Sequence, residues 1–144
     1  MSLSFTLTAD DPLLETDQRF YQELTENGVT IGMEVCFAVE KAPYYSPDLP
    51  EIAARVTQAY RYGLEFAENE DSLCRMRDYL RKTGRAGGAV EIWAIWLGGE
   101  ISPFTPPRWE VSLEELELDM LRWLSREPCR PDSKTMAACL VIHL

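Results

Sequence analysis

The sequence is poor in the residues and patterns on which most enzyme active sites depend. Its only histidine, His143, is next to the C-terminal residue. On one strand, Cys139 and His143 would lie roughly 13 Å apart, too far for a nucleophile–base pair. The chain has no Gly-x-Ser-x-Gly, His-Glu-x-x-His or Asp-x-Asp motif, and no glycine-rich loop that follows a strand and opens a helix. The sequence therefore favours a non-enzyme, with no catalytic residue and no cofactor.

Long apolar runs and closely paired cysteines are also missing. No apolar stretch approaches the roughly 18 residues of a membrane-spanning helix, and no basic start leads into a signal-peptide-like segment, so we expect a cytoplasmic protein. The four cysteines show no Cys-x-x-Cys spacing. Because Cys129, Cys139 and His143 do not have a recurring zinc spacing, we expect structural thiols and no metal.

Positive charge is scarce. The chain carries 14 Lys and Arg against 24 Asp and Glu, which gives a formal net charge of −10 at pH 7. Residues 10–51 carry −8, residues 52–90 carry +2 and residues 91–144 carry −4. Such a surface repels phosphate backbones and anionic lipids, so nucleic acids and membranes are disfavoured as partners and a basic protein is favoured.

What the chain does have is the composition of one globular domain. Its 144 residues, 46% of them hydrophobic, suffice for a core without metal or disulfides, and we expect a single domain over residues 1–144. Two glycine pairs, Gly87-Gly88 and Gly98-Gly99, enclose Ala89–Leu97, which is apolar on both alternating faces. Because such a strand needs cover on both sides, the pattern predicts the central strand of a covered sheet.

Hydrophobic periodicity and capping signals predict the other elements. Alternating apolar residues predict strands over residues 3–9, 29–40 and 136–144. Helical spacing predicts helices over about residues 12–26, 50–62, 70–83 and 113–126. Asn27-Gly28 is expected to end the first helix, and Ser112-Leu-Glu-Glu115 to start the last as a capping box. A stiff, proline-rich loop is expected before Trp109.

This order predicts an α+β protein with a ferredoxin-like four-stranded antiparallel sheet, β-α-β-[α-α]-β-α-β, in which strand 29–40 is an edge. A ferredoxin-like sheet leaves one face open, whereas Ala89–Leu97 needs cover on both. We therefore expect a helical insertion at about residues 50–85 to cover the second face. A mixed α/β sheet with another strand order is the alternative.

A row of acids follows Trp109, and no base occurs again until Arg122. Acids are favoured near helix N-termini, which accounts for Glu114 and Glu115 better than for the later acids. An aromatic anchor beside acids is also typical of surfaces that bind basic proteins. The predicted partner-binding residues are Trp109, Glu110, Glu114, Glu115, Glu117, Asp119, Tyr44 and Tyr45.

The leading functional hypothesis is a small acidic protein–protein interaction domain, for example an immunity or inhibitor protein that neutralises a basic, nuclease-like partner by occlusion. The alternative is a small-molecule-binding protein or enzyme with a pocket between the sheet and the inserted helices. That pocket would be lined by Trp93 or Trp96 and would use Glu91 as a polar group. A carboxylate in this position is more often half exposed at the first turn of the strand or paired with an arginine. A third hypothesis is a homodimer that pairs through strand 29–40.

Overall fold

A computed structural model describes residues 2–41, 55–97 and 105–144, which form one seven-stranded sheet and two α-helices. The strands are β1 (Ser2–Ala9), β2 (Thr16–Glu26), β3 (Val29–Lys41), β4 (Tyr60–Glu65), β5 (Ala89–Leu97), β6 (Arg108–Ser112) and β7 (Ala137–His143). The helices are α2 (Glu70–Thr83) and α3 (Leu118–Arg126), with short 3₁₀ helices η1 (Leu113–Glu115) and η2 (Glu127–Cys129).

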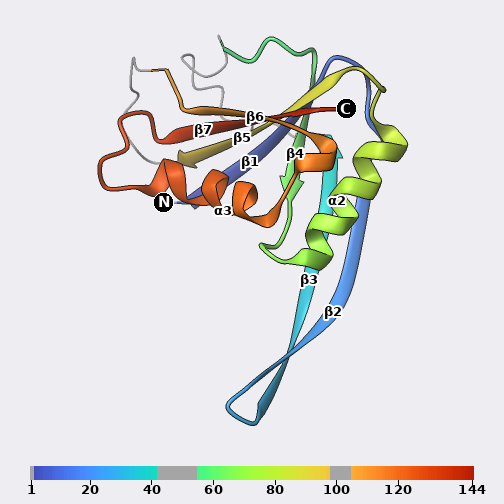
Figure 1. The fold of residues 1–144 in the computed structure, drawn as a ribbon, viewed down its shortest axis with the longest axis vertical. Coiled ribbons are helices and arrows are strands. Elements are labelled where there is room, and N and C mark those ends of the chain that lie inside the picture. Colours follow the sequence, from blue (N-terminus) through green and yellow to red (C-terminus); the bar gives the residue numbers. More distant parts are fainter. Residues whose placement is uncertain (1, 42–54, 98–104) are drawn as a thin grey trace.

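The strand order is β2-β3-β4-β1-β5-β7-β6, and every neighbouring pair is antiparallel except β6 and β7 (Figure 1). The α+β class is confirmed, but the four-stranded ferredoxin-like sheet is wrong. Strand Ala89–Leu97 has the predicted bounds, and it lies inside the sheet between β1 and β7.

The helix predicted over residues 12–26 is wrong, because most of this segment is strand β2. Asn27 and Gly28 are the two loop residues of a β-hairpin and not a helix end. Their φ angles of 52° and 76° fit the type I′ turn that Asn-Gly favours. β2 pairs with β3 along its whole length, up to the pair Glu26↔Val29 beside the turn.

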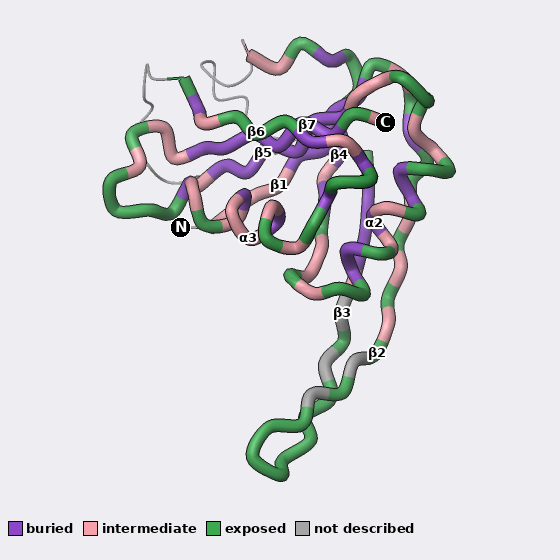
Figure 2. The backbone as a smooth tube through the Cα atoms, viewed as in Figure 1, coloured by how far each residue is buried: buried purple, intermediate pink, exposed green. Residues whose placement is uncertain are grey.

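The β2–β3 hairpin projects from the body of the molecule (Figure 1). Near the body, Phe37 and Val39 are fully buried, and β3 pairs with β4 from Ala38 to Lys41. Residues 20–35, called the arm below, lie beyond that pairing. Figure 2 shows the outer arm mostly as exposed residues. In the described part of the chain the arm is therefore a two-stranded ribbon with no third strand beside it.

The helix predicted over residues 50–62 is not seen in the described residues. Residues 50–54 lie outside them, residues 56–58 have no regular structure, and β4 begins at Tyr60. β4 lies between β3 and β1. Strand 29–40 is therefore not an edge, as the ferredoxin-like arrangement required. The edge strand is β2.

The helix predicted over residues 70–83 is confirmed as α2. Asn69 Oδ1 accepts a hydrogen bond of 2.8 Å from the Ser72 N–H, which caps the first turn. Gly84 ends the helix, and its N–H donates to the Leu80 carbonyl. Leu73, Met76 and Leu80, which lie on one side of the helix, are all buried.

The helix predicted over residues 113–126 is broken into two parts. Ser112 Oγ accepts a 3.3 Å hydrogen bond from the Glu115 N–H, as the capping box predicts. The turn that follows is only the 3₁₀ helix η1, and α3 begins at Leu118. The sequence analysis missed β6, a short edge strand parallel to β7 in a segment expected to be a loop.

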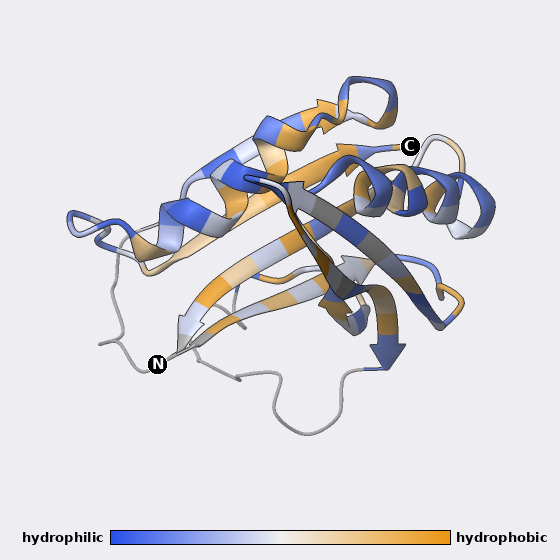
Figure 3. Ribbon diagram, turned by 90° about the horizontal axis from the view of Figure 1, so that it is seen from below, coloured by the Kyte–Doolittle hydropathy of each residue, from blue (hydrophilic) through white to orange (hydrophobic). Residues whose placement is uncertain are grey.

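The larger core lies on the helix-bearing face of the sheet and includes Leu73 and Leu80 of α2 and Leu121 and Leu124 of α3. The predicted placement of the insertion is therefore wrong, because α2 packs on the same core as α3. In Figure 3 the central strands are largely apolar and the helices mix apolar with polar residues. The other face carries a smaller cluster, Trp93, Ile95, Ala137, Cys139 and Val141. No helix in the described ranges is long and apolar enough to cross a membrane.

Candidate functional site

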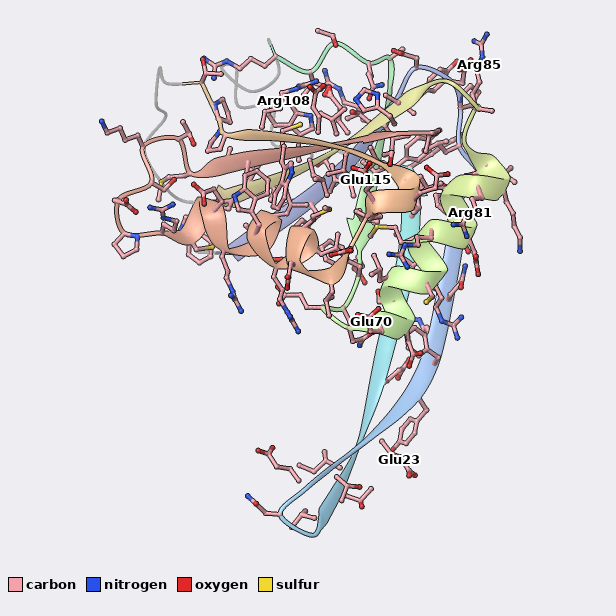
Figure 4. The ribbon with its side chains drawn as sticks, in the orientation of Figure 1. Glu23, Glu70, Arg81, Arg85, Arg108 and Glu115 are labelled. Carbon is pink, nitrogen blue, oxygen red and sulfur yellow. The ribbon has the colours of Figure 1, made fainter. Side chains whose placement is uncertain are left out.

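The predicted acidic residues lie along the β6 edge of the sheet and the turn that leads into α3. They are called the acidic rim below, and all are exposed. The rim consists of Glu110 on β6, Glu114 and Glu115 on η1, and Glu117 and Asp119 at the start of α3. Figure 4 shows Glu115 on the short turn between β6 and α3.

Helix capping accounts for only part of this rim. Glu114 and Glu115 belong to η1, whose N-cap is Ser112. Glu117 is the N-cap residue of α3, but its side chain makes no capping hydrogen bond. The carboxylate of Glu117 is thus exposed without the usual structural role of an acid at this position.

Trp109 and Glu110 lie on opposite faces of β6, so the structure separates two residues that the sequence placed together. Trp109 faces the helices, where its ring meets Trp123 of α3 edge-on at a centroid distance of 5.4 Å, and it stays 37% exposed. Glu110 lies on the other face, with a carboxylate oxygen 3.6 Å from His143 Nε2. Trp109 is therefore a half-covered aromatic that Trp123 holds in place.

Glu117 and Asp119 are brought together at a hollow of about 320 Å³ between the first turns of α2 and α3. Glu70 of α2 also lines this hollow. Arg122 lies 3.4 Å from Asp119, and Arg77 donates to the Leu116 carbonyl. The hollow therefore mixes both signs of charge, whereas the η1 part of the rim carries only acids.

Glu91 forms an ion pair with an arginine, which is a common role for a carboxylate on a strand. It is 4% exposed, and Arg108 Nη1 lies 3.4 Å from Glu91 Oε2. Cys139 Sγ lies 3.9 Å from the same oxygen. Burial and the nearby Glu91 raise the pKa of Cys139 to about 12, so Cys139 is a neutral thiol near pH 7 and a poor nucleophile.

The other three thiols are free cysteines on three different elements. Burial and a hydrogen bond to Glu65 raise the pKa of Cys36 to about 11. Cys74 and Cys129 are exposed, on α2 and η2. Across the described ranges, no group of three or more His, Cys, Asp and Glu side chains is placed to hold a metal ion.

A feature that the sequence analysis missed is a hollow of about 500 Å³ between α2 and the free edge of β2. Leu14, one of its lining residues, is 71% exposed. Arg75 of α2 borders it, stacks 4.0 Å above the Phe20 ring and donates to Gln18. The Asn-Gly dipeptide was the one sequence signal for this arrangement, and it was interpreted as a helix end.

Tyr44 and Tyr45, the other predicted partner-binding residues, lie outside the described residues. Comparison of the chain with known protein families, curated proteins and solved structures finds no match. The chain's own surface is therefore the basis for a functional proposal.

Proposed function

We propose that this protein is a small acidic protein–protein interaction domain that binds a basic protein through the acidic rim. The observation that carries the proposal is the row of exposed carboxylates from Glu110 to Asp119, which no Lys or Arg interrupts. An unbroken row of like charge repels itself, and a basic partner would relieve that repulsion.

The geometry of the rim also supplies an apolar contact. Trp109 is 37% exposed at the start of the rim and is oriented by Trp123. Partly exposed tryptophan side chains are frequent hot spots of protein interfaces. The net charge of −10 would steer a basic partner towards the protein from a distance.

The finer form of the proposal is an immunity or inhibitor protein for a nuclease-like partner. Such a partner uses arginine and lysine side chains to hold phosphate groups, and rim carboxylates would occupy those side chains. Inhibition would then follow from occlusion of the nucleic-acid site, and the protein would need no catalytic group.

The test is capture of partners from a lysate of the source organism on the immobilised protein, followed by mass spectrometry and binding kinetics. The rim variant carries Glu114→Lys, Glu115→Lys and Asp119→Lys. The control variant carries Asp10→Lys, Glu40→Lys and Glu68→Lys, which replace three exposed acids that are not rim residues and change the net charge equally.

We expect a basic protein that the wild type and the control variant retain, with an association rate that falls as salt is added. The rim variant should associate about tenfold more slowly or worse. Equal weakening by both variants would show that net charge and not the rim matters. Failure to retain any basic protein would contradict the proposal.

The described residues give no support to the alternative of a small-molecule pocket lined by Trp93 or Trp96. Trp93 and Glu91 are buried among β5 and β7 residues, at 3% and 4% exposure. Neither they nor Trp96 line the hollows beside α2 and α3 or the one of about 260 Å³ at Gly84–Gly88.

A further inference from the structure

The arm has exposed apolar side chains and a free backbone edge. Tyr21, Val29 and Ile31 are 71%, 59% and 60% exposed. β2 is the outermost strand of the sheet, so its outer edge has no partner strand in the described chain. Isolated two-stranded ribbons are marginally stable in water, and a free edge is a template for another strand.

The hairpin geometry determines which residues face that edge. The residues that flank a two-residue loop, here Glu26 and Val29, form a hydrogen-bonded pair, and such pairs recur at every second residue. The alternate residues of β2, which lie between these hydrogen-bonded pairs, direct their backbone N–H and C=O groups away from β3, towards the free edge. Along β2 these residues are Asp17, Arg19, Tyr21, Glu23 and Thr25.

We propose that two copies of this protein pair edge to edge along the whole of β2 to form a two-fold symmetric dimer. Antiparallel pairing over the full strand Thr16–Glu26 is centred on its middle residue, Tyr21. The outward-facing residues of each copy then face one another and form roughly ten backbone hydrogen bonds. A two-fold contact of this kind closes on itself and does not propagate into a fibre.

The register places opposite charges across the new interface. Arg19 of each copy lies opposite Glu23 of the other, on the same face of the sheet, and opposite charges directly across strands stabilise pairing. Arg19 is 59% exposed beside Asp17 and Glu34. Among the described residues no base lies within ion-pair distance of Glu23, which Figure 4 shows on the arm, away from the body.

The same register brings the tip of each arm to the hollow between α2 and β2 of the other copy. Residues 24–26 of one copy lie beside residues 16–18 of the other, at the hollow's β2 side. Val29 and Ile31 share a sheet face with Phe20, on which Arg75 of α2 stacks. The apolar tip therefore meets the side of the sheet on which α2 and the exposed Leu14 lie.

The bodies of the two copies lie at opposite ends of the paired β2 strands. The body of each copy reaches Asp17, and roughly 26 Å of strand separates the two Asp17 residues. At 0.15 M salt the Debye length is about 8 Å, so repulsion between the two acidic bodies is largely screened. The acidic rim begins on β6, at the far edge of the sheet from β2, and continues through η1 to the start of α3. Dimer formation leaves the rim free and is independent of the proposed function.

The test measures the dissociation constant of the full-length protein by sedimentation at 0.15 M salt. We expect a concentration-dependent dimer. The dimer has two symmetric contacts between positions 19 and 23. In a dimer of the Arg19→Glu variant two acids face one another at both contacts, and in a dimer of the Glu23→Arg variant two bases do. Each variant alone should therefore raise the dissociation constant about tenfold or more. An equimolar mixture restores opposite charges at both positions and should recover wild-type affinity, with the heterodimer seen by native mass spectrometry.

The mixing step also separates interface effects from folding, because two misfolded chains would not rescue each other. Glu40→Arg, an equal charge change on an exposed β3 residue outside the arm, should leave the dissociation constant unchanged. A wild-type protein that stays monomeric at every soluble concentration would overturn the proposal, and so would a mixture no tighter than the single variants. If the β2 backbone amides were protected from exchange with solvent only when a captured basic protein is bound, the edge would be the binding site of that partner. This outcome would also contradict the dimer.

Discussion

A carboxylate removed from water is costly unless a cation and hydrogen bonds compensate it. Glu91 on β5 is 4% exposed, and Arg108 on β6 supplies the cation at 3.4 Å. In the sheet, β7 lies between these two strands, and its Cys139 is within 3.9 Å of both side chains. The pair therefore spans β7 and ties the short edge strand β6, which begins the acidic rim, to the interior of the sheet.

Arg108→Ala should lower the free energy of unfolding by about 1–3 kcal/mol, because it leaves the buried Glu91 carboxylate without its partner. Urea denaturation measures the change. Arg122→Ala is the matched control, since it removes an exposed pair with Asp119 and should cost about 0.5 kcal/mol or less. Equal losses in both variants would show that Arg108 is not a structural tie.

At the scale of elements, the β2–β3 hairpin has two parts with different roles. Its inner part belongs to the body, where Phe37 is fully buried and packs edge-on against Tyr79 of α2 at 5.5 Å. Its outer part, the arm, has no core of its own among the described residues. Tyr21 covers Gly32, where an added Cβ would collide with the tyrosine hydroxyl oxygen. The arm thus fits a contact with another molecule better than a role in stability.

The arm should be removable without loss of the fold. Replacement of Tyr21–Glu34 by Asn-Gly joins Phe20 to Val35, which are paired residues of the hairpin and can flank a two-residue turn. We expect the free energy of unfolding of the monomer to change by about 1 kcal/mol or less, because the deleted segment buries little surface. Circular dichroism and urea denaturation of dilute protein test this, and a cooperative transition lost on shortening would contradict it.

At the scale of the whole molecule, the net charge of −10 acts against the compact state. Like charges brought together on folding repel one another, and salt screens that repulsion. The acids are not spread evenly, since neither the arm nor the row from Glu110 to Asp119 contains a Lys or Arg. The two proposed contact surfaces lie at opposite edges of one sheet.

The thermal midpoint should rise as salt is increased from low ionic strength to about 0.15 M, where the Debye length falls to about 8 Å. The variant Asp10→Lys, Glu40→Lys, Glu68→Lys has less charge to screen and should show a smaller rise. Differential scanning calorimetry at matched protein concentrations measures both. A salt response that is the same in the variant would show that self-repulsion does not limit stability.

The sequence by itself determined the elements whose signals are local. α2 was predicted with its observed bounds because Asn69, Gly84 and the spacing of the apolar residues between them all agree. Ala89–Leu97 was predicted as an interior strand because it is apolar on both faces. The exposure of the acidic rim also followed from sequence, since charged residues are rarely buried without partners.

Only the tertiary structure decided β2, β4 and the strand order. Asn27-Gly28 fits both a helix end and a hairpin turn, and the choice depends on β3, whose residues pair with every residue of β2. Local propensity is a weak prior against such long-range pairing. The hollow at α2 and the free edge of β2 exist only once those strands pair. Sequence alone could not predict the hollow or the free edge, because long-range strand pairing creates both.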